Sequence, residues 1–245
     1  MIEKQIDIPT DAGMMSTFVC HPERNGPHPV VIFYMDAPGI REELRDMARR
    51  LASAGYYVLL PNLYYRANVH ELGPFVGAAN TATREKFMKL MEGLSIAMVM
   101  EDTDAMLAFA DTDAAASKGP AGCVGYCMSG QFAINAAARH PDRIAAAASI
   151  YGVRLVTDQP DSPHLAARRA EGELYFACAE TDHWAPFEMV ESLKESLWED
   201  DVNAEVEIYA GVEHGFAFPG RPAYNRDAAE RHWERLFALF GRTLR

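Results

Sequence analysis

Three residues with catalytic chemistry, Cys127, Asp182 and His214, each follow a strand-like segment of this sequence. A thiolate attacks a carbonyl carbon, and an imidazole that titrates near neutrality can accept the thiol proton. A carboxylate beside the imidazole fixes its tautomer and stabilises the imidazolium that forms. The order nucleophile, acid, base along the chain therefore predicts a triad for acyl transfer. Glu180, close before Asp182, is an alternative acid.

Cys127 lies in residues 125–130, Gly-Tyr-Cys-Met-Ser-Gly. The small apolar residues at 121–126 are typical of a strand buried on both faces, and the alanine-rich residues from 129 onward favour a helix. A strand that turns directly into a helix holds the turn residue in a strained conformation with its side chain exposed. The helix N-terminus favours a thiolate, and the N–H of Met128 is directed at the oxyanion. The alternative is a buried core cysteine.

Two earlier loops also follow apolar segments, and we expect them at the same edge of a parallel sheet. Residues 30–34 lead into Asp36 and Ala37, and the N–H of Ala37 is the expected second oxyanion donor. Asp36 is a site candidate, or more simply a residue that caps the next helix. Residues 57–60 lead to Arg66, whose guanidinium suits a substrate carboxylate. Stacking on a neighbouring tyrosine, or pairing with an acidic neighbour, is the alternative for Arg66.

The spacing of apolar residues predicts alternating strands and helices through residues 1–245. Residues 2–8 and 14–20 predict two short antiparallel strands around a turn. We therefore expect one α/β domain with the α/β-hydrolase fold. Its central sheet is mostly parallel, helices cover both faces, and an antiparallel strand pair lies at the N-terminus. Residues 67–83 are expected to be irregular, and residues 152–171 to form a surface excursion.

Composition narrows the classes of partner. The net charge is −12 and no lysine- or arginine-rich block occurs, which argues against nucleic acid and anionic membranes. No apolar run is long enough for a transmembrane helix and no signal peptide is recognised, so we expect a cytoplasmic protein. The four cysteines lack CxxC pairs and the histidines lack metal-ligand spacing, so we expect no disulfide, metal or other cofactor. The histidines other than His214 are expected on the surface or at helix ends.

Three segments carry a resemblance to a known family: residues 125–130, residues 182–186 (Asp-His-Trp-Ala-Pro) and residues 214–216 (His-Gly-Phe). The chain resembles the dienelactone hydrolase family of carboxymethylenebutenolidase-like α/β hydrolases. Residues 35–39 (Met-Asp-Ala-Pro-Gly) and 63–66 (Leu-Tyr-Tyr-Arg) add to a resemblance that spans essentially the whole chain. It implies a triad and an oxyanion hole made by two N–H groups. The triad is Cys127, His214 and Asp182, and the donors are Ala37 and Met128.

The resemblance also implies two substrate-binding positions. Family members use an acid at the position of Asp36, usually glutamate, that interacts with the resting cysteine and is displaced when substrate binds. They use an arginine matching Arg66 for the substrate carboxylate. Asp36 is one methylene shorter than glutamate. The type enzyme has a second arginine at the position of Phe218, whereas the nearest arginine here is Arg221.

The implied reaction is hydrolysis of a small anionic enol-lactone or ester through a thioester acyl-enzyme, as for a carboxylated dienelactone from aromatic degradation. One alternative is an enzyme of the same fold that acts on another acyl substrate, such as a thioester, a simple ester or a peptide-like amide. A second alternative is a non-catalytic binding member of the fold.

Overall fold

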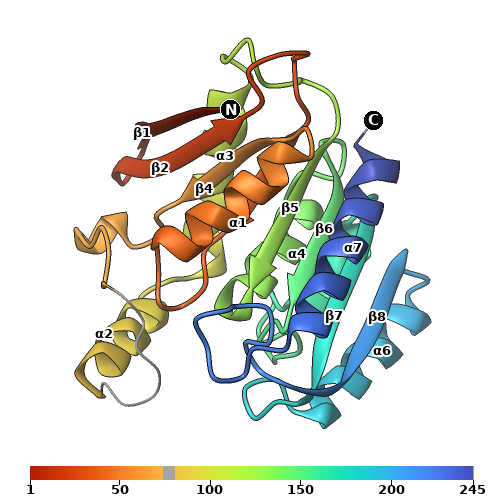
Figure 1. Cartoon of the computed structure of the whole chain (residues 1–245). Coiled ribbons are helices and arrows are strands. Elements are labelled where there is room, and N and C mark those ends of the chain that lie inside the picture. Colours follow the sequence, from red (N-terminus) through yellow and green to blue (C-terminus); the bar gives the residue numbers. More distant parts are fainter. Residues whose placement is uncertain (74–80, 245) are drawn as a thin grey trace.

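The computed structural model describes residues 1–73 and 81–244. Within these residues the centre is an eight-stranded sheet in the order β1-β2-β4-β3-β5-β6-β7-β8 (Figure 1). The strands are β1 (Ile2–Thr10), β2 (Gly13–His21), β3 (Val30–Tyr34), β4 (Tyr57–Pro61), β5 (Ala121–Tyr126), β6 (Ile144–Ile150), β7 (Glu173–Thr181) and β8 (Ala204–Glu213). Pairing is parallel from β4 through β8, and β1 and β2 are antiparallel. The predicted sheet is therefore confirmed.

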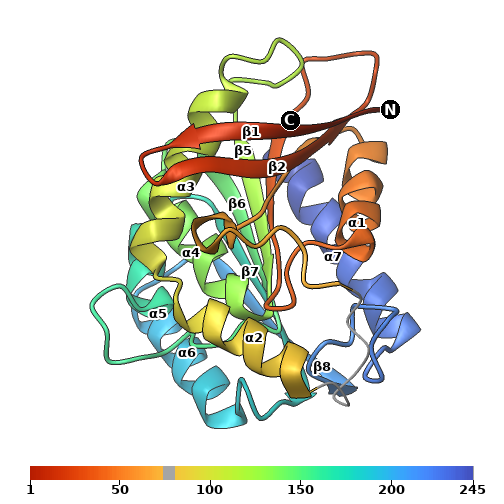
Figure 2. The same cartoon turned by 90° about the vertical axis from the view of Figure 1, so that its left-hand side faces the viewer.

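Helices cover both faces of this sheet. In Figures 1 and 2, α1 and α7 lie on one face and α3, α4 and α6 on the other, while α2 lies at the lower end of the molecule. The helices are α1 (Glu42–Ser53), α2 (Thr81–Glu92), α3 (Ile96–Ala110), α4 (Gly130–Arg139), α5 (Pro163–Ala166), α6 (Phe187–Glu199) and α7 (Arg226–Thr243). Short 3₁₀ turns are η1 (Tyr65–Ala67), η2 (Cys127–Ser129) and η3 (Ala167–Arg169). Among the described helices, none combines the length and apolarity needed to cross a membrane.

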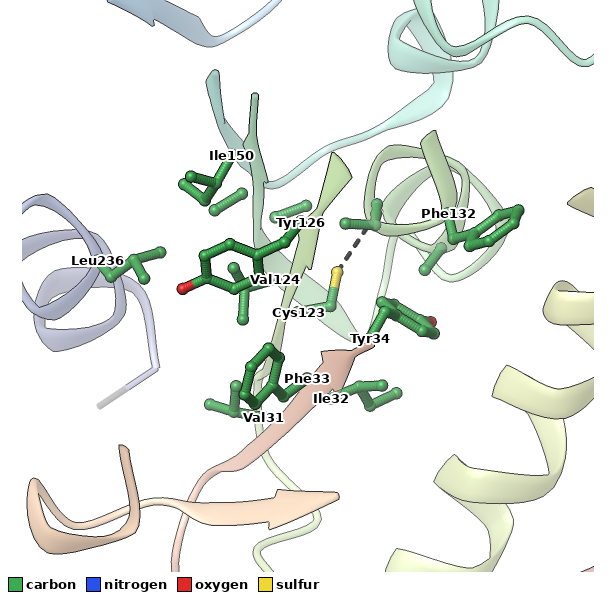
Figure 3. Close-up of a cluster of buried hydrophobic side chains, with 14 of the residues drawn as sticks. Val31, Ile32, Phe33, Tyr34, Cys123, Val124, Tyr126, Phe132, Ile150 and Leu236 are labelled. Atoms are coloured by element: carbon green, nitrogen blue, oxygen red, sulfur yellow. Dashed lines mark hydrogen bonds between the residues drawn. The ribbon is translucent and has the colours of Figure 1, made fainter. Parts of the chain in front are cut away.

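Strands β3 and β5 lie wholly within the core. Both strands are buried along their whole length, because helices cover both faces of the sheet here. Figure 3 shows their side chains between Phe132 of α4 and Leu236 of α7. Cys123 in β5 donates to the carbonyl of Ala133 at 3.3 Å, and burial raises the pKa of its thiol well above the ordinary value. This rigid centre fixes the ends of β3 and β5, after which Asp36 and Cys127 follow.

Two loop expectations need correction. Residues 152–171 do not run only over the surface, because Leu155, Pro163 and Ala167 are buried there as α5 and η3 pack against α4. Helix α2 begins at Thr81, inside the segment expected to be irregular. Residues 74–80 of that segment lie outside the described residues. The polar and turn-forming residues of these two segments gave no indication of the buried apolar positions in one or of the start of a helix in the other.

The expectation of surface histidines is wrong for His232, His21 and His28, all of which are buried. His232 in α7 donates through Nδ1 to the carbonyl of Ala229, and its Nε2 lies 3.0 Å from the hydroxyl oxygen of Tyr126. Burial lowers the pKa of His232 to about 3, so the ring is neutral. A neutral imidazole with both nitrogens hydrogen-bonded can be buried at little cost. The hydrogen bond with His232 holds the side chain of Tyr126, the residue before Cys127.

Candidate active site

Cys127 lies at a sharp turn between β5 and α4. Its backbone φ is 54°, in the left-handed region that residues with a side chain seldom adopt. The turn requires small neighbours, because a Cβ at Gly125 would lie 2.0 Å from the carbonyl oxygen of Ser129. A Cβ at Gly130 would lie 2.3 Å from the Oγ of Ser149. Gly125 and Gly130 therefore allow the chain to pack closely at this turn, and the Cys127 side chain remains partly exposed.

His214 and Asp182 meet at this turn from the ends of β8 and β7. The Nδ1 of His214 donates to the Oδ2 of Asp182 at 2.7 Å. The other carboxylate oxygen accepts the backbone N–H groups of Trp184 and Ala185 at 2.9 and 3.1 Å. Glu180, the alternative acid, instead accepts the N–H of Gly211 at 2.7 Å. The geometry therefore brings Asp182, and not Glu180, to the imidazole.

The other side of His214 is hydrogen-bonded to Cys127. Burial by itself would lower the pKa of His214, but the charge of Cys127 and the hydrogen bonds from Cys127 and Asp182 raise it to about 9. A raised pKa means that this environment stabilises the imidazolium form of His214. The residues thus form a connected chain of acid, imidazole and sulfur that can attack a carbonyl and return a proton to a leaving group.

The loop after β3 is tied to the turn after β5. The Oγ of Ser129 donates to the carbonyl of Met35. The hydroxyl of Tyr64 donates to the carbonyl of Ala37 at 2.6 Å and lies 3.6 Å from the Sδ of Met128. Ala37 and Met128, whose N–H groups are the expected oxyanion donors, are therefore held by one tyrosine.

Asp36 is fully buried, and arginines occupy both of its carboxylate oxygens. Arg41 donates to Oδ1 at 2.6 Å and to Oδ2 at 3.2 Å, and Arg221 also donates to Oδ2. Burial acts to raise the pKa of Asp36, but the charges of the two arginines prevail and lower it. Asp36 is therefore an ionised member of a buried ion cluster. Arg41, and not Asp36, is the residue before the first turn of α1.

Arg66 lies in η1 with its guanidinium directed at α3. It donates to the Oδ2 of Asp102 at 2.6 Å and lies 4.7 Å above the ring of Tyr65. Tyr65 also donates to Asp102, at 2.8 Å. The structure therefore gives Arg66 both contacts of the alternative interpretation, an acidic partner and an aromatic ring.

Sequence reasoning missed Tyr151, which follows β6 at the same edge of the sheet as Cys127. Its φ is 38°, its side chain is fully buried, and its ring meets that of His214 edge-on at 5.0 Å. Its hydroxyl has no hydrogen-bond partner among the residues that the structure describes. The signal was available, because the rule that located the other site residues at strand ends applies to β6 too.

Sequence reasoning also missed the partners of the expected site arginines and acids. Arg41 binds Asp36, and Asp102 binds Arg66. Asp102 was recognisable as an acid whose neighbours one helical turn away, Val99 and Met106, are apolar. In the described parts of the chain, no group of three or more His, Cys, Asp and Glu side chains is placed to hold a metal ion.

Comparisons with known proteins agree with this architecture. A family model described as "Dienelactone hydrolase family" matches residues 15–244. A provisionally named carboxymethylenebutenolidase of Methylorubrum extorquens is 27% identical over 242 residues, which cover 96% of this chain and 79% of the relative. A provisionally named 2-oxo-3-(5-oxofuran-2-ylidene)propanoate lactonase of Bradyrhizobium sp is 26% identical over 232 residues, which cover 93% of this chain and 89% of the relative. A solved structure from Klebsiella pneumoniae, also titled provisionally as a dienelactone hydrolase, aligns with a TM-score of 0.85 and 24% identity over 98% of both chains, and so confirms the fold.

Proposed function

This chain belongs to the dienelactone hydrolase family, and on that premise we propose that it hydrolyses a small carboxylic ester or lactone through a thioester on Cys127. The observation that carries the proposal is the continuous hydrogen-bonded chain from Asp182 through His214 to Cys127. It ends at a strained turn, where the side chain of Cys127 is partly exposed. Asp182 orients the imidazole, and His214 exchanges a proton with the reacting groups.

In the acylation step, the thiolate of Cys127 forms a bond to the carbonyl carbon, and the carbonyl electrons move onto oxygen. The N–H groups of Ala37 and Met128 are the proposed donors to that oxyanion. When the carbonyl re-forms, the ester C–O bond breaks and the imidazolium of His214 protonates the departing oxygen. A lactone opens in this step, so its leaving oxygen remains on the acyl chain.

In the deacylation step, water attacks the thioester and gives a proton to the now neutral His214. Collapse of the second tetrahedral intermediate releases the carboxylic acid and restores the thiolate of Cys127. The imidazolium re-forms in the same step, so the resting ion pair is recovered without any other reactant. A thiolate suits this cycle because it is both a strong nucleophile and a good leaving group.

The anionic enol-lactone expected from the sequence remains a finer prediction within this proposal. It requires Arg66 to exchange its contact with Asp102 for the carboxylate of the substrate. Two alternatives also remain: turnover of a thioester, simple ester or amide by the same triad, and binding without turnover. Accumulation of a covalent adduct on Cys127 without product release would favour the binding alternative.

The direct test compares wild type with Cys127→Ser and Cys127→Ala on a dienelactone and on an uncharged aryl ester. We expect turnover in wild type, a loss of about a thousandfold or more in Cys127→Ala, and a mass increase on Cys127 during turnover. Cys178→Ala is the matched control, because Cys178 is a buried cysteine of β7. Undiminished kcat in Cys127→Ala would refute the nucleophile assignment.

A further inference from the structure

Resting on the proposed function, we propose that Tyr151 is a positioning residue, whose aromatic ring holds the imidazole of His214 in the orientation that reaches Cys127. Tyr151 directly follows β6, and Ile150, the last residue of β6, pairs with Tyr126 at the end of β5. Cys127 directly follows Tyr126. The strand register therefore places Tyr151 next to the nucleophile.

The imidazole of His214 needs a contact besides its two hydrogen bonds. The bond from Nδ1 to the Oδ2 of Asp182, at 2.7 Å, holds one nitrogen. A single hydrogen bond tolerates a range of angles, so it leaves the direction of the opposite nitrogen less well defined. The hydrogen bond to Cys127 cannot supply that direction throughout the cycle, because the sulfur bonds to the acyl group during turnover.

The ring of Tyr151 supplies a lasting contact. Its centroid lies 5.0 Å from that of the His214 ring, and the two planes are inclined at 62°. Aromatic rings favour this edge-on arrangement, which stabilises the pair beyond the burial of surface. A turn of the imidazole would lose it. Neither ring gives up this contact when Cys127 is acylated, so the imidazolium stays directed at the reacting groups.

Tyr151 is itself held in place. Its side chain is fully buried, and its backbone N–H donates to the carbonyl of Ala177 at 2.6 Å. Three further rings contact it, with centroid distances of 5.2, 5.9 and 6.1 Å for Phe216, Tyr126 and Phe218. Displacement of the phenol would disrupt this packed aromatic cluster. The imidazole therefore lies against a fixed surface.

The same segment also holds the nucleophile. The N–H of Val153 donates to the carbonyl of Cys127 at 3.1 Å. The φ angles of Tyr151 and Cys127 are 38° and 54°, so both residues adopt the left-handed conformation and need such support from their surroundings. Residues 151–153 therefore contact the base through a ring and the nucleophile through a backbone hydrogen bond.

The hydroxyl of Tyr151 is not required for this role. It is buried and has no hydrogen-bond partner within residues 1–73 and 81–244. Burial raises the pKa of the phenol well above its ordinary value, so the side chain stays uncharged across the pH range of activity. Because a buried hydroxyl without a partner destabilises a fold, its removal should stabilise the protein slightly.

The experiment compares Tyr151→Phe, which keeps the ring, with Tyr151→Leu, which removes it, on an uncharged aryl ester. We expect the kcat of wild type in Tyr151→Phe. In Tyr151→Leu we expect kcat to fall about tenfold or more with KM little changed. Phe240→Leu is the matched control, because Phe240 is fully buried and meets the ring of Tyr56 edge-on at 5.8 Å. It lies beside Gly122, at the end of β5 remote from Cys127, and its loss should leave kcat unchanged.

The second readout is the titration of His214, followed by NMR of isotopically labelled histidine rings. Burial acts to lower the pKa of His214, but its contacts with Cys127 and Asp182 raise it to about 9. A loosened imidazole keeps those contacts less well, so the pKa should fall by about one unit in Tyr151→Leu. Tyr151→Phe and Phe240→Leu should keep the wild-type pKa. A loss of stability alone would not change it.

Equal losses of kcat in Tyr151→Phe and Tyr151→Leu would overturn the inference, because the hydroxyl would then be the group that matters. Wild-type kcat, or an unchanged pKa of His214, in Tyr151→Leu would overturn it too. If Tyr151→Leu does not fold, Tyr151→Met takes its place, since an unbranched side chain adapts to irregular space.

The inference and the proposed function can fail separately. If wild type hydrolyses no ester faster than Cys127→Ala does, the proposed function fails. The titration of His214 requires no turnover, so it still tests whether the ring of Tyr151 holds the imidazole in that case.

Discussion

Replacement of Asp182 by asparagine should move the alkaline limit of activity to lower pH. The pKa of His214 is raised to about 9, so the imidazolium is present below that pH and is lost above it. The amide of the Asp182→Asn variant would keep an oxygen for the N–H groups of Trp184 and Ala185 but would no longer offer a carboxylate to Nδ1. The fold should therefore persist while the imidazolium loses its stabilising partner.

The size of the shift follows from the lost contact. A hydrogen bond to a charged group is worth about 1.5–3 kcal/mol. One pKa unit corresponds to about 1.4 kcal/mol, so the alkaline limit should fall by about one to two units. With a wild-type limit near 9, the Asp182→Asn limit is expected at about pH 7–8. Because the asparagine also disturbs the tautomer, kcat should fall by about a thousandfold or more.

The assay is kcat/KM for an uncharged aryl ester from about pH 6 to about pH 10. Alkylation of Cys127 by iodoacetamide over the same range provides a second profile that does not depend on turnover. Glu180→Gln is the matched control, since Glu180 binds the Gly211 N–H and its loss should leave the limit in place. An alkaline limit that is the same in Asp182→Asn and wild type would refute the assigned coupling.

Two further predictions concern the turn and the oxyanion region. Gly125→Ala should lower the free energy of unfolding by about 3 kcal/mol or more, because its Cβ would lie 2.0 Å from the Ser129 carbonyl oxygen. Gly241→Ala is the control and should be stabilising or neutral, since nothing lies within 4 Å of its Cβ. Urea denaturation measures the free energy of unfolding of both variants, and equal effects would contradict the prediction for Gly125. Tyr64→Phe should lower kcat about tenfold with KM little changed, by releasing the Ala37 carbonyl. A rise in KM alone would show that Tyr64 contributes only to binding.

The order of the elements and the places where chemistry could occur can be predicted from the amino-acid sequence alone. Strands such as β3 and β5 are continuous apolar runs because both faces of a parallel sheet are covered by helices, so their pattern is local and readable. Loops at the carboxyl ends of such strands meet at one edge, which is why Cys127, Asp182 and His214 could be chosen before their contacts were known. The turn at Cys127 could also be located from the sequence, because a strand-like segment precedes it and a helix-like segment follows it.

Which charged groups bind one another is known only from the folded chain. Asp36 pairs with Arg221, which is 185 residues away, and Arg66 pairs with Asp102, which is 36 residues away. No local pattern encodes such pairings, because they depend on which loops and helices the sheet order brings together. The choice between Asp182 and Glu180 has the same origin, since both lie at the carboxyl end of β7 and only the position of His214 separates them. Hydrophobic periodicity specifies elements along the chain, whereas charge pairing is specified by distances across it.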